Sequence, residues 1–257
     1  MSGDELARPR TGTAAGVPYV ALPPTAADAD PDGMPPLVLA WPGRRPPRTE
    51  TALAAAVPMT GIPGWRIYAG LPDGSDDGAV VELAASHAPA LVAEVRTDLG
   101  LADGPIGLAG FSLGATVALR VLARREVAVT AAALIAPLPV VGLRAADLAP
   151  DVAGAIATGS GATKAALLLA GGGNDDAVPP SELAALRDQL RTAGVSDVEL
   201  AMFRMGHALA AEPGTEARPQ IAEAISVDAA VTNWFRGHLG IRPRGLSDPA
   251  PARGATV

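Results

Sequence analysis

Gly110-Phe111-Ser112-Leu113-Gly114 is the stretch that decides the fold, because it joins a short apolar run to a helical pattern. Residues 106–109 before it predict a buried strand, and residues 113–125 after it predict a helix. A serine at a strand-to-helix turn, with glycine two residues away on each side, is the G-x-S-x-G nucleophile elbow. We expect side chains at positions 110 and 114 to collide with the neighbouring strand and helix. The strained turn should also raise the Ser112 hydroxyl above the sheet, near the positive end of the helix.

The composition narrows the chemistry that is open to this chain. Its 257 residues, 49% of them hydrophobic, suffice for one sizeable α/β domain. The formal net charge of −7 gives no indication of a nucleic-acid partner. The chain has no cysteine, which excludes thiol nucleophiles, disulfides and cysteine-bound metals. The first residues lack the apolar core of a signal peptide, and the apolar stretch 131–141 is short and broken by prolines. We therefore expect a cytoplasmic protein with no membrane partner.

Short apolar runs alternate with helical patterns along the chain, which predicts a mostly parallel sheet with helices on both faces. The expected strands are residues 19–22, 37–41, 65–69, 106–109, 131–136, 165–170 and 198–203. The expected helices are residues 79–99, 113–125, 181–193 and a last one that ends near His238.

The predicted domain covers residues 17–240, between a flexible N-terminus (1–16) and a flexible tail (241–257). Residues 137–163 are the longest connection after the elbow. They are expected to form either a small lid over the site or a surface loop with a short helix.

The chain has only three histidines that could act as the base for Ser112. A serine hydroxyl is a weak nucleophile at neutral pH, so it needs a base, and that base needs a carboxylate to fix its tautomer. His87 lies within a helical pattern upstream of the serine, and His238 lies at a helix end. His207 follows the predicted strand 198–203, at the sheet edge where open α/β sheets keep their sites. We predict that His207 is the base.

The carboxylate is expected between the serine and the base in chain order, just past a strand end. Asp175 and Asp176 both follow the predicted strand 165–170. Neighbouring side chains point in different directions, so only one should face the histidine. The other would be solvated, or would act near the N-terminus of the next helix. Asp147 and Asp151, after the preceding strand, are the weaker alternatives.

A serine elbow, then an aspartate and then a histidine, each after a strand, is an order of motifs that resembles the α/β-hydrolase superfamily. The resemblance is to its dienelactone-hydrolase, prolyl-oligopeptidase-like and small carboxylesterase branches. The acid segment of this family is often G-x-x-D-x-x-V-P, and residues 172–179 match it with Asp175 in the acid position. Its base commonly lies in a Gly-His pair after the last core strand, like Gly206-His207. The resemblance covers residues 19–239 and implies the α/β-hydrolase fold, with Ser112, Asp175 and His207 as the catalytic triad.

An oxyanion hole needs two backbone N–H donors, and the first should be Leu113, directly after the nucleophile. The second is expected in the loop after strand 37–41, where the family has His-Gly and this chain has Trp41-Pro42-Gly43-Arg44. Proline has no N–H, so the second donor should be Gly43 or Arg44.

Two further groups of side chains are expected near the site. Trp41 and Phe111 either pack the core around the elbow or contact substrate. The arginines of the oxyanion loop, Arg44, Arg45 and Arg48, are either solvated or bind a carboxylate or phosphate of the substrate.

The motifs together predict a serine hydrolase that cleaves a small or medium carboxylic ester through an acyl-enzyme, with no metal or organic cofactor. A thioesterase or acyl-releasing cyclase, acting on a chain bound to an acyl carrier protein, would use the same residues. A non-catalytic binding protein on a hydrolase scaffold is the alternative of another class.

Overall fold

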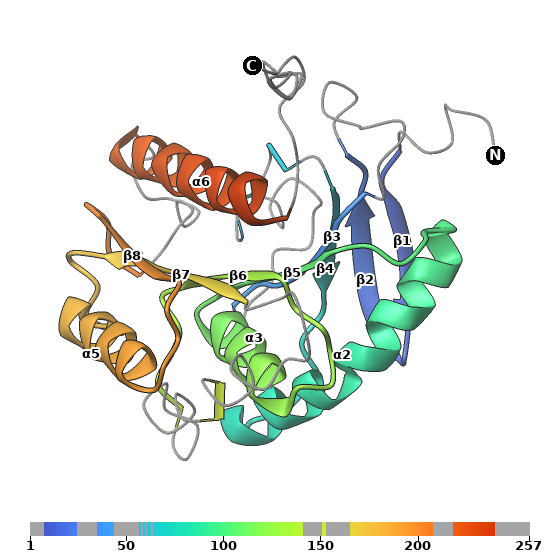
Figure 1. Cartoon of the computed structure of the whole chain (residues 1–257), viewed down its shortest axis with the longest axis horizontal. Coiled ribbons are helices and arrows are strands. Elements are labelled where there is room, and N and C mark those ends of the chain that lie inside the picture. The colour runs from blue at the N-terminus through green and yellow to red at the C-terminus, as the bar shows by residue number, and fades with distance from the viewer. Residues whose placement is uncertain are drawn as a thin grey trace, which may run out of the picture.

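The computed structural model describes residues 8–24, 35–43, 57, 59, 61–62, 64–140, 151–152, 165–207 and 218–239 of the chain (Figure 1). Its strands are β1 (Arg10–Ala14), β2 (Val17–Leu22), β3 (Leu37–Trp41), β4 (Trp65–Ala69), β5 (Ile106–Phe111), β6 (Ala131–Ile135), β7 (Ala166–Gly172) and β8 (Val198–Phe203). Its helices are α2 (Asp77–Leu99), α3 (Leu113–Arg124), α5 (Pro180–Thr192) and α6 (Arg218–His238). The seven predicted strands are present, with ends that differ from the prediction by at most two residues.

The eight strands form one sheet in the order β1-β2-β4-β3-β5-β6-β7-β8. β2 pairs antiparallel with both β1 and β4, and every other pair is parallel. The prediction of a mostly parallel sheet is therefore confirmed. β5 lies between β3 and β6, so the elbow that follows it is flanked by the ends of two other strands.

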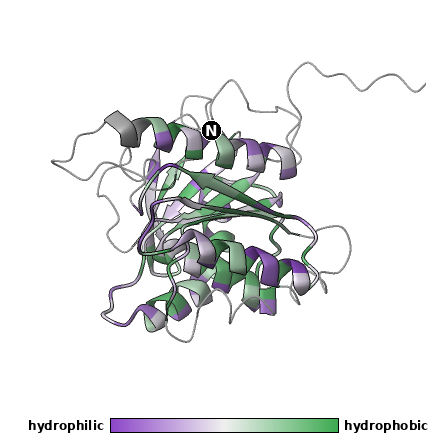
Figure 2. Ribbon diagram, turned by 90° about the vertical axis from the view of Figure 1, so that its left-hand side faces the viewer, coloured by the Kyte–Doolittle hydropathy of each residue, from purple (hydrophilic) through white to green (hydrophobic). Residues whose placement is uncertain are grey.

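Helices cover both faces of the sheet, as predicted: α6 lies on one face, and α2, α3 and α5 lie on the other (Figures 1 and 2). β3, β5 and β6 are buried along almost their whole length, which explains why they are continuous apolar runs and not alternating patterns. One core cluster joins the sheet to the three helices and includes Leu108 and Leu119. A second lies under α6 and includes Ala109 and Phe235.

α2 has the length and apolar composition that a membrane-spanning helix needs. In this structure nine of its residues are buried, and its buried face belongs to the first core cluster. The Asp76 side chain caps its N-terminus by accepting from the N–H groups of Gly78, at 2.8 Å, and Ala79. An ion pair of 2.8 Å between Glu82 and Arg120 ties α2 to α3. These contacts are those of a core helix in a layered α/β protein.

β1 was not predicted, because residues 1–16 were expected to be a flexible end, and Arg10–Ala14 instead form this strand. It pairs antiparallel with β2, where Gly12 is opposite Tyr19 and leaves room for the tyrosine ring. The two strands are joined by Ala15 and Gly16, both at positive φ, as the two central residues of a type I′ hairpin turn require. β1 places residues 10–14 in the sheet, before the predicted start of the domain at residue 17. Residues 1–7 and 241–257 lie outside the described residues, and so do residues 141–150 and 153–163 of the connection 137–163. The C-terminal limit of the domain and the lid or loop alternatives therefore stay predictions.

Candidate active site

Ser112 lies in a strained turn between β5 and α3, with φ 55° and ψ −123°. A positive φ is uncommon for a residue with a side chain, and it persists only when the surroundings hold it. The Ser112 N–H donates to the carbonyl of Ile135 at the end of β6, over 2.9 Å. The Ser112 carbonyl accepts from the N–H groups of Ala115, Thr116 and Leu138. The backbone of this serine is thus held by α3 and by the segment after β6.

The glycines on either side of Ser112 permit this turn. A Cβ on Gly110 would meet the carbonyl group of Gly114 and would lie 2.6 Å from the Ala115 nitrogen. A Cβ on Gly114 would meet the carbonyl oxygen of Trp41 and would lie 2.5 Å from that of Pro42. The predicted collisions are therefore confirmed, with the helix at position 110 and with the end of β3 at position 114.

His207 lies between Ser112 and Asp175 and bonds to both. Its Nε2 is 2.8 Å from the Ser112 Oγ, and its Nδ1 is 2.9 Å from the Asp175 Oδ2. A carboxylate oxygen can only accept, so beside an ionised Asp175 the imidazole proton sits on Nδ1. Nε2 is then free to accept from the serine hydroxyl. The structure therefore brings together the three residues that the sequence predicted, in the expected order.

Asp175, and not Asp176, faces the histidine. The Asp175 side chain is fully buried, whereas Asp176 is exposed. The second carboxylate oxygen of Asp175 accepts from the N–H groups of Ala177 at 2.9 Å and Val178 at 2.8 Å. These two bonds fix the carboxylate in the loop between β7 and α5, so that its other oxygen points to His207.

The loops that carry the acid and the base are bonded to each other. The Gly173 N–H donates to the Phe203 carbonyl at 2.7 Å, and the Asn174 N–H donates to the Met205 carbonyl at 3.1 Å. Gly172 makes this approach possible, because a Cβ there would meet the carbonyl oxygen of Met205. In the sequence, Gly172 stands out only as part of the acid motif, but the run of three glycines at 171–173 after an apolar strand is itself a signal of close backbone approach.

The other candidate residues do not join this arrangement. His238 bonds to the Trp234 carbonyl at 2.7 Å and lies 3.3 Å from a carboxylate oxygen of Asp197, in keeping with a structural role. His87 lies in the middle of α2. Asp151 is exposed, and Asp147 lies outside the described residues.

Two of the candidate oxyanion residues lie beside Ser112. Leu113 is the first residue of α3, so its N–H has no acceptor within the helix. Gly43 approaches from the end of β3, and a Cβ built on it would lie 3.4 Å from the Ser112 Cβ. Arg44 lies outside the described residues, as do Arg45 and Arg48. Leu113, the predicted first donor, and Gly43, one of the two candidates for the second, are therefore neighbours of the serine.

The two aromatic residues near the elbow have different surroundings. Trp41 is 1% exposed and lies in the core cluster on the side of α2 and α3. Its burial favours the packing alternative over contact with substrate. Phe111 is half-buried, and its ring centroid lies 5.2 Å from that of His207, with the planes tilted by 36°. Phe111 therefore lies beside the site, whereas Trp41 packs in the core next to it.

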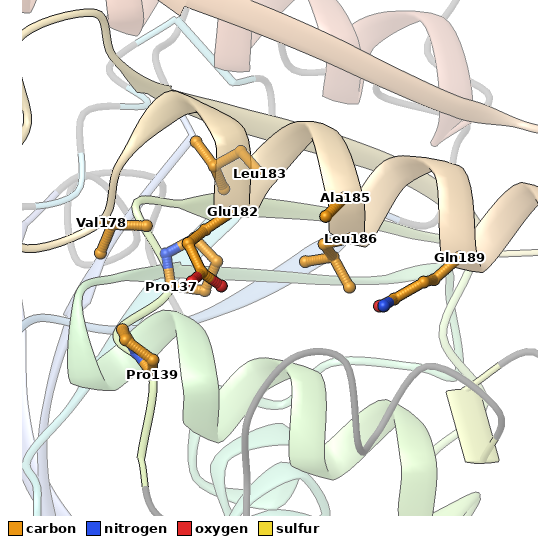
Figure 3. Close-up of a pocket in the computed structure, with 8 residues that line it drawn as sticks. All are labelled: Pro137, Pro139, Val178, Glu182, Leu183, Ala185, Leu186 and Gln189. Atoms are coloured by element: carbon orange, nitrogen blue, oxygen red, sulfur yellow. The ribbon is translucent and has the colours of Figure 1, made fainter.

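A small cavity of about 80 Å³ adjoins these loops, on the side of α5 (Figure 3). It is lined by Pro137 and Pro139 after β6, by Val178 in the loop before α5, and by Glu182, Leu183, Ala185, Leu186 and Gln189 of α5. Val178 links the cavity to the site, because its N–H holds the Asp175 carboxylate. Within the described ranges, no cluster of His, Asp and Glu side chains could hold a metal ion.

Solved structures of several hydrolases are similar to this one. A puromycin-hydrolysing peptidase from Mycobacterium tuberculosis matches with a TM-score of 0.65 at 19% identity, over 95% of this chain and 41% of that one. A variant of the esterase rPPE matches with a TM-score of 0.64 at 15% identity, over 91% of this chain and 83% of that one. A Klebsiella pneumoniae protein assigned as a dienelactone hydrolase matches with a TM-score of 0.60 at 15% identity, over 90% of this chain and 100% of that one.

The similarity lies in structure and not in sequence. No protein-family model matches the chain, and a sequence search of curated proteins gave no match. The chain spans about two fifths of the length of two peptidases that it matches, 41% and 43%. The sheet order, the strand-to-helix turn at Ser112 and these structural matches agree. The chain has the α/β-hydrolase fold.

Proposed function

We propose that this protein is a serine hydrolase that cleaves small or medium carboxylic esters. The observation that carries the proposal is the continuous line of hydrogen bonds from Asp175 through His207 to Ser112, with Ser112 held in a strained turn. Such a line supplies what a serine nucleophile lacks at neutral pH: a base that takes its proton and a carboxylate that orients the base.

In the first half of the proposed reaction, the Ser112 Oγ attacks the acyl carbonyl of the ester and its proton passes to the His207 Nε2. Asp175 accepts the Nδ1–H bond and stabilises the imidazolium that forms. The negative charge on the former carbonyl oxygen is stabilised by the N–H groups of Leu113 and Gly43. When the tetrahedral intermediate collapses, His207 gives its proton to the alcohol, which leaves, and the acyl group stays on Ser112.

In the second half, water replaces the alcohol. His207 takes a proton from the water as it attacks the acyl-enzyme, and the same two N–H groups stabilise the second oxyanion. The collapse of this intermediate returns the proton to the Ser112 Oγ and releases the carboxylic acid. Every step uses groups of this chain and water.

The choice of an ester is supported by two of the similar structures, one an esterase and one assigned as a dienelactone hydrolase. Other matches are peptidases, so the rate of ester cleavage should be compared with the rate of amide cleavage. We expect the p-nitrophenyl esters of acetate and butyrate to be cleaved faster than the matching anilides.

The test combines activity with covalent labelling. We expect a fluorophosphonate probe to label the folded protein at Ser112. The Ser112→Ala variant should lose both the label and at least about 10³-fold in kcat. A folded wild-type protein that neither takes the probe nor cleaves the esters would instead support a binding protein on a hydrolase scaffold. An oxoester and a thioester of the same acyl chain, measured side by side, separate esterase from thioesterase activity.

A further inference from the structure

We infer that Thr116 is a positioning residue, which orients the peptide whose N–H forms one half of the proposed oxyanion hole. The inference rests on the proposed function. Thr116 lies in the first turn of α3 and is 1% exposed. Its hydroxyl donates to the carbonyl of Leu138 over 2.7 Å, across 22 positions of the chain. The helix that begins at the elbow is thereby tied to the segment that follows β6.

Leu138 passes this restraint on to the serine. Its N–H donates to the Ser112 carbonyl at 3.2 Å, and that carbonyl also accepts from Ala115 at 3.0 Å and Thr116 at 3.3 Å. Thr116 therefore acts on the Ser112 carbonyl twice, directly through its own N–H and indirectly through its hydroxyl and Leu138.

The Ser112 carbonyl and the Leu113 N–H belong to one peptide unit. Because that unit is planar, the bonds that hold the carbonyl also determine the direction of the N–H. The same bonds polarise the unit, which makes the N–H a stronger donor in a site of low dielectric constant. The residue that donates to the oxyanion and the residues that orient it are therefore different, and the sequence motif contains only the first.

Strain explains why the restraint is needed. Ser112 has φ 55°, and Ala136, at the end of the neighbouring strand, has φ 45°. Residues without glycine's freedom keep such conformations only where the surroundings over-determine them. The Ala136 N–H is bonded to the Ala170 carbonyl at 2.8 Å, and two residues later the Leu138 carbonyl is held, among the described residues, by the Thr116 hydroxyl. Removal of that hydroxyl should let this segment and the Ser112 peptide shift.

The test is Thr116→Val, which keeps the shape of the side chain and removes the hydroxyl, with Thr116→Ser, which keeps the hydroxyl. Oxyanion donors act in the transition state and not in substrate binding, and the loss of one such donor costs about 10²–10³-fold in kcat. For an indirect restraint we expect kcat to fall about tenfold in the valine variant, with KM unchanged. The rate of fluorophosphonate labelling should fall in proportion, and the serine variant should recover most of both.

A matched control is Thr97→Val, which removes a hydroxyl that donates to the Ala93 carbonyl at 3.0 Å on the exposed side of α2. We expect this control to keep full activity, and urea unfolding should show that all three variants are folded at the assay temperature. Wild-type kcat and labelling rate in folded Thr116→Val, or equal losses in the valine and serine variants, would overturn the inference. Failure of the wild-type protein to take the probe would overturn the proposed function itself.

Discussion

The carbonyl oxygen of Trp41 occupies the space that a side chain on Gly114 would need. Gly114 belongs to the first turn of α3, and Trp41 is the last residue of β3. The helix that follows the nucleophile therefore packs directly on the strand end from which Gly43, the second proposed oxyanion donor, emerges. A single glycine sets the distance between the two halves of the proposed oxyanion hole.

Replacement of this glycine should damage both stability and activity. In Gly114→Ala the added methyl group must push α3 and the β3 end apart. We expect the free energy of unfolding in urea to fall by about 1–3 kcal/mol, the usual cost of overpacking, and kcat to fall with it. The control is Gly237→Ala near the end of α6, where an added Cβ meets nothing within 4 Å. This variant should gain up to about 1 kcal/mol and keep its activity. Equal stability of the two variants would contradict this account of the elbow.

The adjacent aspartates offer a second matched pair. In Asp175→Asn the amide oxygen should stay with the N–H groups of Ala177 and Val178, which places the NH₂ toward the His207 Nδ1. Nδ1 must then accept, the imidazole proton moves to Nε2, and the base can no longer take the serine proton. We expect kcat for ester hydrolysis to fall by about 10⁴-fold, the cost of the wrong tautomer.

Asp176→Asn is the control, because this side chain is exposed. Its kcat should stay within about twofold of the wild type, the usual tolerance of a surface position. The reverse result, with activity lost at Asp176 and kept at Asp175, would require the acid loop to rearrange during turnover.

The elbow and the three aligned residues could be predicted because each depends on local sequence. Each reacting residue follows the end of a strand, and a short apolar run that ends in a glycine or an aspartate marks such a place within a few residues. Asp175 and Asp176 could be ranked only by the family motif, since the choice depends on which side chain is buried. That burial is set by two backbone N–H groups later in the same loop.

Features that depend on contacts with another segment of the chain could not be predicted. The sequence of β1, Arg-Thr-Gly-Thr-Ala, has no apolar run, and it forms a strand because β2 offers a free edge and Gly12 accommodates the Tyr19 ring. The bond between Thr116 and Leu138 joins positions 22 residues apart, and no motif connects them. Local patterns thus predicted the reacting groups, whereas the contacts that orient them required the structure.

The two tyrosines predict how the protein responds to alkali. Burial raises the pKa of Tyr68, which is 1% exposed and donates to the Val57 carbonyl at 3.2 Å. Burial, together with the hydrogen bond to Asp98, also raises the pKa of Tyr19 above its usual value of 10.0. Above pH 10.0 the unfolded chain therefore releases these protons more readily than the folded protein does, so stability should fall as the pH rises.

Tyrosinate absorbance measures this directly, because the chain has only these two tyrosines. We expect the folded protein to show less tyrosinate at about pH 10.5 than the protein in guanidinium, which ionises about three quarters of its tyrosine there. In Tyr68→Phe, only Tyr19 should remain to titrate, and the stability should depend less steeply on pH in this range. Coincident titration curves for folded and unfolded protein would contradict the burial of both hydroxyls.

The different surroundings of Trp41 and Phe111 predict opposite kinds of defect. Trp41 is buried beneath the site, so Trp41→Phe should leave a cavity and lower the free energy of unfolding by about 1–3 kcal/mol, with KM unchanged. Phe111 lies beside the His207 ring, so Phe111→Leu should remove an aromatic contact worth about 0.5–1.5 kcal/mol and free the imidazole to turn. We expect a loss of kcat/KM at Phe111 and a loss of stability at Trp41, measured by ester hydrolysis and urea unfolding on the same preparations. A raised KM in stable, folded Trp41→Phe would show instead that substrate contacts this ring and that Trp41 belongs to the binding site.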